Sequence, residues 1–341
     1  MKLIRTEDAV GHVICHDITR IIKDKEKGAA FKKGHIVTKE DIPALLAIGK
    51  EHLYVWEKDE SVLHEDEAAQ VLARACRNEG MDQSKPCEGK IEIYARTKGL
   101  FVVDRERLLA INSLDDMMIA TRRSLQPVAA GDKLAGTRII PLVIAKERMA
   151  AVSAIADEES PILRILPYVR KRFGVVTTGS EVYHGRIADT FTPVIEEKVS
   201  VYGGQIIAHL TVPDEKEAIL DAIGKMRLAQ ADVVLCTGGM SVDADDLTPA
   251  AVRASGAGIV TYGAPVLPGA MFLLGYYEDN TPVMGLPGCV MYAKATIFDR
   301  MLPRIMADYP VTRHDIVELG DGGLCLGCHE CRFPNCAYGA C

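Results

Sequence analysis

The chain lacks the features that would direct it to a membrane, to secretion or to nucleic acid. Its longest uncharged stretch, 259–277, is broken by glycine and proline into strands and turns, so we do not expect it to cross a bilayer. Residues 1–8 lack the apolar core of a signal peptide. Basic residues are not in excess, since the formal net charge is −7, which argues against unspecific nucleic-acid binding. We therefore expect a cytoplasmic protein with no membrane or nucleic-acid partner.

The length of 341 residues and the hydrophobic content of 48% allow two or three domains, each with its own core. The pattern along the chain predicts a small α/β module over 1–60, a mixed α+β domain over 61–160, a linker over 161–172, an α/β domain over 173–310 and a cysteine-rich tail over 311–341. We find no catalytic motif in 61–160. The histidines of the first module (His12, His16 and His35) lack metal-ligand spacing and are interpreted as surface or structural residues.

Beyond residue 173, predicted strands alternate with predicted helices. We expect strands at 174–178, 205–212, 233–236 and 259–262, a hairpin of 271–277 and 282–285, and helices from Thr192, after an Asp214 N-cap, from Pro249 and over 290–307. This alternation predicts a three-layer α/β/α domain with a mostly parallel sheet. Such domains bind ligands beyond the carboxyl ends of their strands.

One stretch, 232–249, combines a buried strand, a glycine turn and a run of carboxylates. Gly238 and Gly239 allow a sharp turn and a close approach of backbone to ligand, and Thr248 followed by Pro249 is typical of a helix start. Backbone amides at such a turn can hold an anion. The carboxylates that follow the turn could hold a hard cation such as Mg²⁺: Asp243, Asp245 and Asp246. The alternative is a solvated acidic loop.

Six short motifs follow one another along this region: Thr178-Gly-Ser-Glu181, Gly185-Arg-Ile-Ala-Asp189-Thr190, Val212-Pro-Asp214-Glu, the segment from Thr237 to Thr248, Leu267-Pro-Gly269 and Gly285-Leu-Pro-Gly288. In this order they resemble the molybdopterin-binding domain of molybdenum-cofactor biosynthesis proteins, and in pattern the MoeA-type molybdotransferases in particular.

This resemblance implies a MogA-like fold that binds molybdopterin or its adenylylated form and uses Mg²⁺ and molybdate. It implies catalytic roles for Glu181, Asp214 and Asp246. It also implies a cofactor pocket made of Thr178, Gly179, Asp189, Thr190, Thr237, Gly238, Gly239, Ser241, Thr248, Pro268, Gly269, Pro287 and Gly288.

The sequence departs from the resembled pattern at two loops. Leu267-Pro-Gly-Ala-Met271 stands where two anion-binding lysines are usual, and Cys289 follows Gly288 where Asn-Pro is usual. The retained carboxylates favour a transferase that inserts molybdate. The missing lysines favour a non-catalytic molybdopterin carrier or chaperone for a molybdoenzyme client, with the cysteine tail as a docking or redox element. A third alternative is an iron-sulfur accessory protein with a vestigial pterin fold. Members of the resembled family often form homodimers, but no interface can be predicted from this sequence.

Five of the ten cysteines lie in the last seventeen residues: Cys325, Cys328, Cys331, Cys336 and Cys341. Thiolates at this spacing can wrap one zinc ion or an iron-sulfur cluster. The first three resemble the ferredoxin C-x2-C-x2-C run and suggest a [4Fe-4S] cluster. His329 offers an alternative ligand, which leaves zinc open, and an unmetallated tail is the third alternative.

Overall fold

The computed structural model describes residues 2–22, 26–55, 60–156, 161–241, 243 and 246–338. Asp245 and Cys341, both predicted metal ligands, lie outside the described residues. The chain divides into two compact units. Unit 1 comprises Met1–Ala95, Asp104–Arg122 and Asp132–Arg164, and unit 2 comprises Arg96–Val103, Arg123–Gly131 and Ile165–Cys341. Each unit is therefore discontinuous in sequence.

The first part of unit 1 is a small module built on two antiparallel strand pairs. Strand β1 pairs with β4 and β2 pairs with β3, around a core that includes Ile14, Leu45 and Leu53. Its elements are β1 (Lys2–Arg5), η1 (Thr6–Asp8), β2 (Ile18–Ile22), β3 (Glu26–Phe31), α1 (Asp41–Ala47) and β4 (His52–Val55).

The rest of unit 1 packs helices against a four-stranded antiparallel sheet of order β6-β7-β11-β9. Alternating apolar side chains on β7, including Ile91 and Ile93, are fully buried. The elements are β5 (Val62–His64), α2 (Glu65–Cys76), β6 (Met81–Gln83), β7 (Lys90–Ala95), α3 (Arg105–Asn112), β9 (Met117–Thr121), β11 (Lys133–Ile139), β12 (Val143–Ala145) and α4 (Lys146–Ile155).

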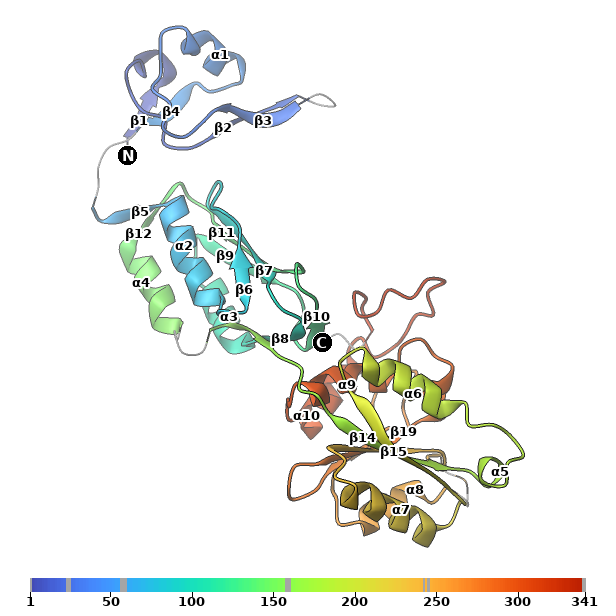
Figure 1. The fold of residues 1–341 in the computed structure, drawn as a ribbon. Coiled ribbons are helices and arrows are strands. Elements are labelled where there is room, and N and C mark those ends of the chain that lie inside the picture. Colours follow the sequence, from blue (N-terminus) through green and yellow to red (C-terminus); the bar gives the residue numbers. More distant parts are fainter. Residues whose placement is uncertain are drawn as a thin grey trace. The chain divides into compact units, whose positions relative to one another are not determined.

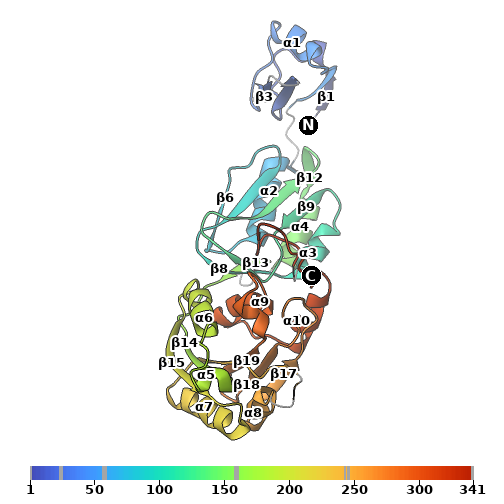
Figure 2. The same ribbon diagram turned by 90° about the vertical axis from the view of Figure 1, so that its right-hand side faces the viewer.

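Unit 2 is organised on a six-stranded sheet of order β15-β14-β16-β19-β18-β17, and Figure 2 labels all of these strands except β16. The four strands β15, β14, β16 and β19 are parallel, and β18 runs antiparallel between β19 and β17. The strands are β14 (Arg172–Thr178), β15 (Gln205–Val212), β16 (Val233–Thr237), β17 (Gly258–Tyr262), β18 (Leu273–Tyr276) and β19 (Pro282–Leu286).

Helices cover both faces of this sheet, as Figure 1 shows, which confirms the predicted α/β fold class. Side chains alternate along β16: Val233 and Leu235 pack with α6 and α9, whereas Val234 and Cys236 pack with α7 and α8. The helices are α5 (Ser180–Tyr183), α6 (Phe191–Ser200), α7 (Lys216–Leu228), α8 (Thr248–Ala254), η2 (Gly288–Met291), α9 (Ile297–Met306), α10 (Arg313–Val317) and η3 (Glu318–Gly320).

Unit 2 also takes in two short strands from earlier in the chain. Strands β8 (Gly99–Val103) and β10 (Gln126–Val128) form a small sheet with β13 (Leu163–Leu166), in the order β10-β8-β13. The side chains of Leu100 and Val102 pack with Ala307 and Tyr309. No helix within the described parts is long and apolar enough to span a bilayer.

Three predicted details of the elements are wrong. Asp214 does not cap α7, whose N-cap is Glu215, because its carboxylate accepts a hydrogen bond from the Ser180 backbone. Thr248 is the first residue of α8 and not its cap. The last helix was expected over 290–307, but α9 begins at Ile297, because the Thr296 side chain and Asp299 form a capping box there.

Candidate functional site

The carboxyl ends of β14, β15, β16 and β19 meet at one edge of the unit 2 sheet, because these strands are parallel. Strand β17 runs in the same direction as β19, so the loop after Tyr262 also leaves from this edge. All the predicted pterin-site segments follow one of these strands. We call this edge the loop edge.

The glycine turn after β16 is held tightly against the end of β14. Gly238 and Gly239 have φ angles of +83° and +57°, which favour glycine. A Cβ atom on Gly238 would lie 2.3 Å from the Thr178 carbonyl oxygen. The Thr248 hydroxyl donates to the Gly238 carbonyl at 2.9 Å. The structure therefore brings together Thr178, the two glycines and Thr248.

The Thr178 hydroxyl is an unsatisfied polar group beside this turn. Thr178 is only 4% exposed, and its Oγ1 has no hydrogen-bond partner among the described residues. A Cβ atom on Gly238 or Gly239 would lie 2.7 Å or 3.2 Å from this oxygen. Because buried hydroxyls are normally hydrogen-bonded, a partner supplied by a ligand at the turn would satisfy it.

Glu181 belongs to the turn after β14, whereas Asp214 follows β15 and reaches that turn through a hydrogen bond. The Asp214 carboxylate accepts a 2.7 Å hydrogen bond from the Ser180 amide, which anchors this turn to the end of β15. Gly179 has a φ angle of +142°, which allows the chain to enter α5 directly after the strand. Glu181 lies in α5 and is exposed. One carboxylate therefore positions the backbone and the other faces solvent.

The acidic loop after the glycine turn is partly closed by its own hydrogen bonds. The Asp243 amide donates to the Asp246 carboxylate at 3.0 Å, and the Asp246 amide donates to the Asp243 carbonyl at 3.0 Å. Ser241 is exposed, and its carbonyl accepts from the Tyr262 hydroxyl at 3.1 Å. Among the described residues, Asp243 and Asp246 do not form a group of three metal ligands within 4.8 Å.

Asp189 is the centre of a polar network that the sequence analysis only partly identified. Its carboxylate accepts from the Phe191 amide at 2.8 Å and from the Thr192 hydroxyl at 2.5 Å, and it lies 3.3 Å from His209 Nε2. The Thr177 hydroxyl lies 2.9 Å from the same histidine nitrogen. Burial raises the pKa of Asp189, but the hydrogen bonds and His209 outweigh it and hold that pKa below its ordinary value.

The remaining predicted pocket residues lie on neighbouring loops of the loop edge. Thr190 is the N-cap of α6, and its hydroxyl donates to Met291 Sδ at 3.0 Å, next to the turn of Pro287 and Gly288. Thr237 is buried at the end of β16 and donates to the Thr177 hydroxyl at 3.3 Å. The sequence analysis missed Thr177, Thr192 and His209, because these residues lie on β14, α6 and β15 and so form no linear motif.

The cysteine tail packs against the loop that follows β17. The Leu267 amide donates to the Gly323 carbonyl, and the Cys325 amide donates to the Leu267 carbonyl, both at 2.8 Å. The Tyr338 hydroxyl donates to the Pro268 carbonyl at 2.6 Å. Gly269, with a φ angle of +125°, lies so close to α9 that a Cβ atom there would be 2.7 Å from the Ile297 side chain.

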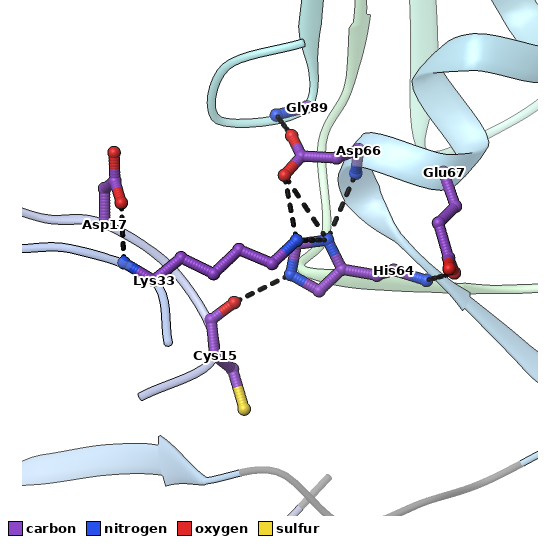
Figure 3. A network of polar contacts seen from close by, with 7 residues as sticks. All are labelled: Cys15, Asp17, Lys33, His64, Asp66, Glu67 and Gly89. Atoms are coloured by element: carbon purple, nitrogen blue, oxygen red, sulfur yellow. Dashed lines mark hydrogen bonds and ion pairs between the residues drawn. The ribbon is translucent and has the colours of Figure 1, made fainter. Parts of the chain in front are cut away.

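Unit 1 holds a polar cluster that the sequence analysis did not single out. His64, Glu65 and Asp66 place potential metal-ligating atoms within 4.8 Å of one another. Figure 3 shows the Lys33 ammonium directed at this cluster, 3.0 Å from both His64 Nδ1 and Asp66 Oδ2. His64 Nε2 lies 2.8 Å from the Cys15 carbonyl oxygen, so the ring is also engaged on its other side. The Lys33 ammonium therefore already pairs with the Asp66 carboxylate of this cluster.

Comparison with known families identifies the domain that carries the loop edge. Residues 174–307 match the family model described as "Probable molybdopterin binding domain". We refer to this region as the molybdopterin-type domain. Residues 3–57 match a separate "Domain of unknown function (DUF8806)". The family match accounts for most of unit 2, and it begins two residues after the start of β14.

Curated relatives match parts of the chain. A CinA-like protein of Citrifermentans bemidjiense is 41% identical over 86 residues, which cover 25% of this chain and 20% of that protein. A putative molybdopterin biosynthesis protein of Methanocaldococcus jannaschii is 31% identical over 173 residues, which cover 43% of this chain and 41% of that protein. The matched segments are thus less than half the length of either relative.

Among solved structures, the molybdopterin biosynthesis enzyme MoaB of Thermus thermophilus shares 20% identity, with a TM-score of 0.32 over 40% of this chain and 89% of that chain. A CinA protein of unknown function from Thermoplasma acidophilum shares 19% identity, with a TM-score of 0.34 over 40% of this chain and 98% of that chain.

Proposed function

We propose that the molybdopterin-type domain binds molybdopterin or its adenylylated form at the loop edge and takes part in molybdenum-cofactor biosynthesis. The observation that carries the proposal is the Thr178 hydroxyl, buried without a partner beside the glycine turn in a domain that matches a molybdopterin-binding family. A phosphate or pterin oxygen at the turn would satisfy this hydroxyl and could accept from the turn's backbone amides.

The carboxylates of the loop edge give the domain the chemistry of a molybdate-inserting enzyme. Asp243 and Asp246 offer the oxygen ligands that Mg²⁺ prefers, and Mg²⁺ would neutralise charge on phosphate and molybdate oxygens. Asp246 Oδ2 accepts a hydrogen bond from the Asp243 amide, which holds this carboxylate within the loop. Asp214 would keep the turn of Ser180 in place, and exposed Glu181 would reach the bound ligand.

The second candidate function is a non-catalytic carrier that delivers molybdopterin to a molybdoenzyme. The observation that favours it is the loop after β17. Leu267 is 58% exposed, and this loop carries no lysine between residues 263 and 272. An apolar side chain offers no positive charge to an anionic substrate, whereas it can contact a protein partner.

The first test is the pterin content of protein purified without air, measured by acid-iodine oxidation and fluorescence. A pterin near one per chain supports the site. Absence of pterin, together with no binding of added molybdopterin, would refute it.

The variant Asp246→Asn separates the two functions. The amide oxygen can still accept from the Asp243 backbone, so the loop keeps its hydrogen bond while the negative charge is lost. An enzyme should then release AMP from adenylylated molybdopterin, with molybdate and Mg²⁺, at least about a hundredfold more slowly while pterin affinity changes little. A carrier shows no AMP release before or after the substitution.

A further inference from the structure

Four cysteines of the tail line a single cavity. The cavity has a volume of about 650 Å³, and its lining includes Cys325, Cys328, Cys331 and Cys336. Its walls are mainly apolar, with Leu324, Leu326 and Phe333 among them. His329, the other candidate ligand in the sequence, is exposed and does not line the cavity. The arrangement therefore offers four sulfur ligands around one space.

The tail is held in this position by contacts that do not involve the cysteine sulfurs. Leu324 forms a parallel bridge with Leu267, and Tyr338 is buried. Phe333 packs against the core of unit 2, and its ring lies 6.3 Å from that of Tyr338. The Gln126 side chain donates to the Pro334 carbonyl at 3.2 Å. The backbone that carries the cysteines is thus anchored at both ends of the cavity.

We propose that these four cysteines bind a [4Fe-4S] cluster. Zinc held by four thiolates at about 2.3 Å would bring the sulfurs within about 3.8 Å of one another. No three of the described tail sulfurs lie within 4.8 Å of one another, although all four line the same cavity. In a cubane cluster each thiolate binds a different iron, so the sulfurs stand further apart around a larger volume.

The charges around the cavity also suit a cluster with four thiolate ligands. Such a cluster is negatively charged, and the cavity lining contains two basic residues, Lys294 and Arg332, and no acidic residue. Cys325 and Cys336 are half-buried, whereas Cys328 and Cys331 are exposed, so one side of the cluster would face solvent. These four cysteines could hold a cluster whether or not the loop edge binds pterin.

The test is anaerobic reconstitution of the full chain with iron and sulfide, followed by metal and acid-labile sulfide analysis. We expect about four iron and about four sulfide per chain, with a visible absorption band that dithionite bleaches. Electron paramagnetic resonance of the reduced protein should show one cluster signal. One zinc ion per chain with no visible absorption, or no bound metal, would overturn the proposal.

Substitutions assign the ligands. Cys325→Ala and Cys336→Ala should each reduce bound iron to less than about one per chain. Cys87→Ala, at an exposed cysteine outside the tail, is the matched control and should keep the full iron content. Circular dichroism checks that each variant folds. If a tail variant does not fold, the iron and sulfide content of the wild-type chain still decides the outcome.

Discussion

At the residue scale, the Thr178 hydroxyl provides the most direct test of ligand binding. Thr178→Val removes a buried, unsatisfied hydroxyl at nearly constant volume. Without ligand, we expect the free energy of unfolding to rise by about 1 kcal/mol, because the desolvation cost of the hydroxyl is removed. With molybdopterin, we expect the dissociation constant to increase about fivefold to tenfold, the effect of one lost hydrogen bond. Urea denaturation and calorimetric titration measure the two quantities.

The matched control is Thr137→Val, at another fully buried threonine. Its hydroxyl donates to the Ile91 carbonyl at 3.3 Å, so the substitution should lower stability and leave pterin affinity unchanged. Equal pterin affinity in Thr178→Val and wild type would mean that the hydroxyl does not contact the ligand.

Glu65 should make the stability of unit 1 depend on pH. Burial, followed by the charge of Asp66, raises the pKa of Glu65 to about 7 from an ordinary value of 4.5. The folded state then binds this proton more tightly than the unfolded state, so stability decreases as the pH rises from about 4.5 to about 7. Glu65→Gln should remove this loss and stabilise the protein at pH 8 by about 1 to 2 kcal/mol, less than the full shift implies because of residual solvation.

Urea denaturation at pH 5 and pH 8, followed by circular dichroism, measures the Glu65 effect. Glu79→Gln, at an exposed glutamate that also belongs to unit 1, is the control and should change stability little at either pH. The prediction fails if Glu65→Gln and the wild type lose the same stability between the two pH values.

At the scale of elements, the glycine turn joins the ends of β14 and β16. Gly238→Ala would strain a φ angle of +83° and place a Cβ atom 2.3 Å from the Thr178 carbonyl oxygen. Because the obstructing atom is backbone, the strands must shift, and we expect a loss of more than about 3 kcal/mol in stability. Gly203→Ala is the control: its φ angle is +87° but nothing lies within 4 Å, so only the cost of strain, about 1 to 2 kcal/mol, should appear.

The sequence predicted the strands of the molybdopterin-type domain because buried parallel strands are short apolar runs that end in glycine, threonine or proline. It did not predict the partners of polar side chains. Asp214 and Thr248 have the residue types of helix caps, but tertiary contacts with Ser180 and Gly238 use their side chains instead. The start of the last helix is predictable from the sequence, because Thr296 and Asp299 have the residue types and spacing of a capping box.

The network around Asp189 could not be predicted in the same way. His209 and Thr177 lie on neighbouring strands, β15 and β14, and approach each other only through the sheet register. The four cysteines of the cavity were easier to single out as candidates, because they all lie within twelve residues of sequence. Local motifs thus predicted candidate ligands, and long-range pairing determined which polar groups meet.

At the scale of the whole molecule, unit 2 depends on segments that precede its main sheet. The Tyr168 hydroxyl donates to the Gly99 carbonyl at 2.9 Å, and Leu100 and Val102 are buried against Ala307. A fragment of residues 161–341 lacks β8 and β10 and should lose about 3 to 6 kcal/mol of stability, the value of burying two such side chains. Hydrogen exchange of β14 in the fragment and in the full chain measures this loss.

The matched truncation removes residues 1–60 and keeps both short strands. It should leave the protection of β14 unchanged. If the 161–341 fragment is as well protected as the full chain, the contributions of β8 and β10 to unit 2 are negligible.

Pro268 links the cysteine cavity to the loop edge. It lines the cysteine cavity, its carbonyl accepts from Tyr338, and its loop leaves the sheet at the edge where pterin is proposed to bind. If an iron-sulfur cluster restrains this loop, cluster assembly changes pterin affinity by some factor, and thermodynamic linkage requires pterin to change cluster affinity by the same factor. Iron supply and exposure to oxygen would then regulate how much molybdenum cofactor the protein retains.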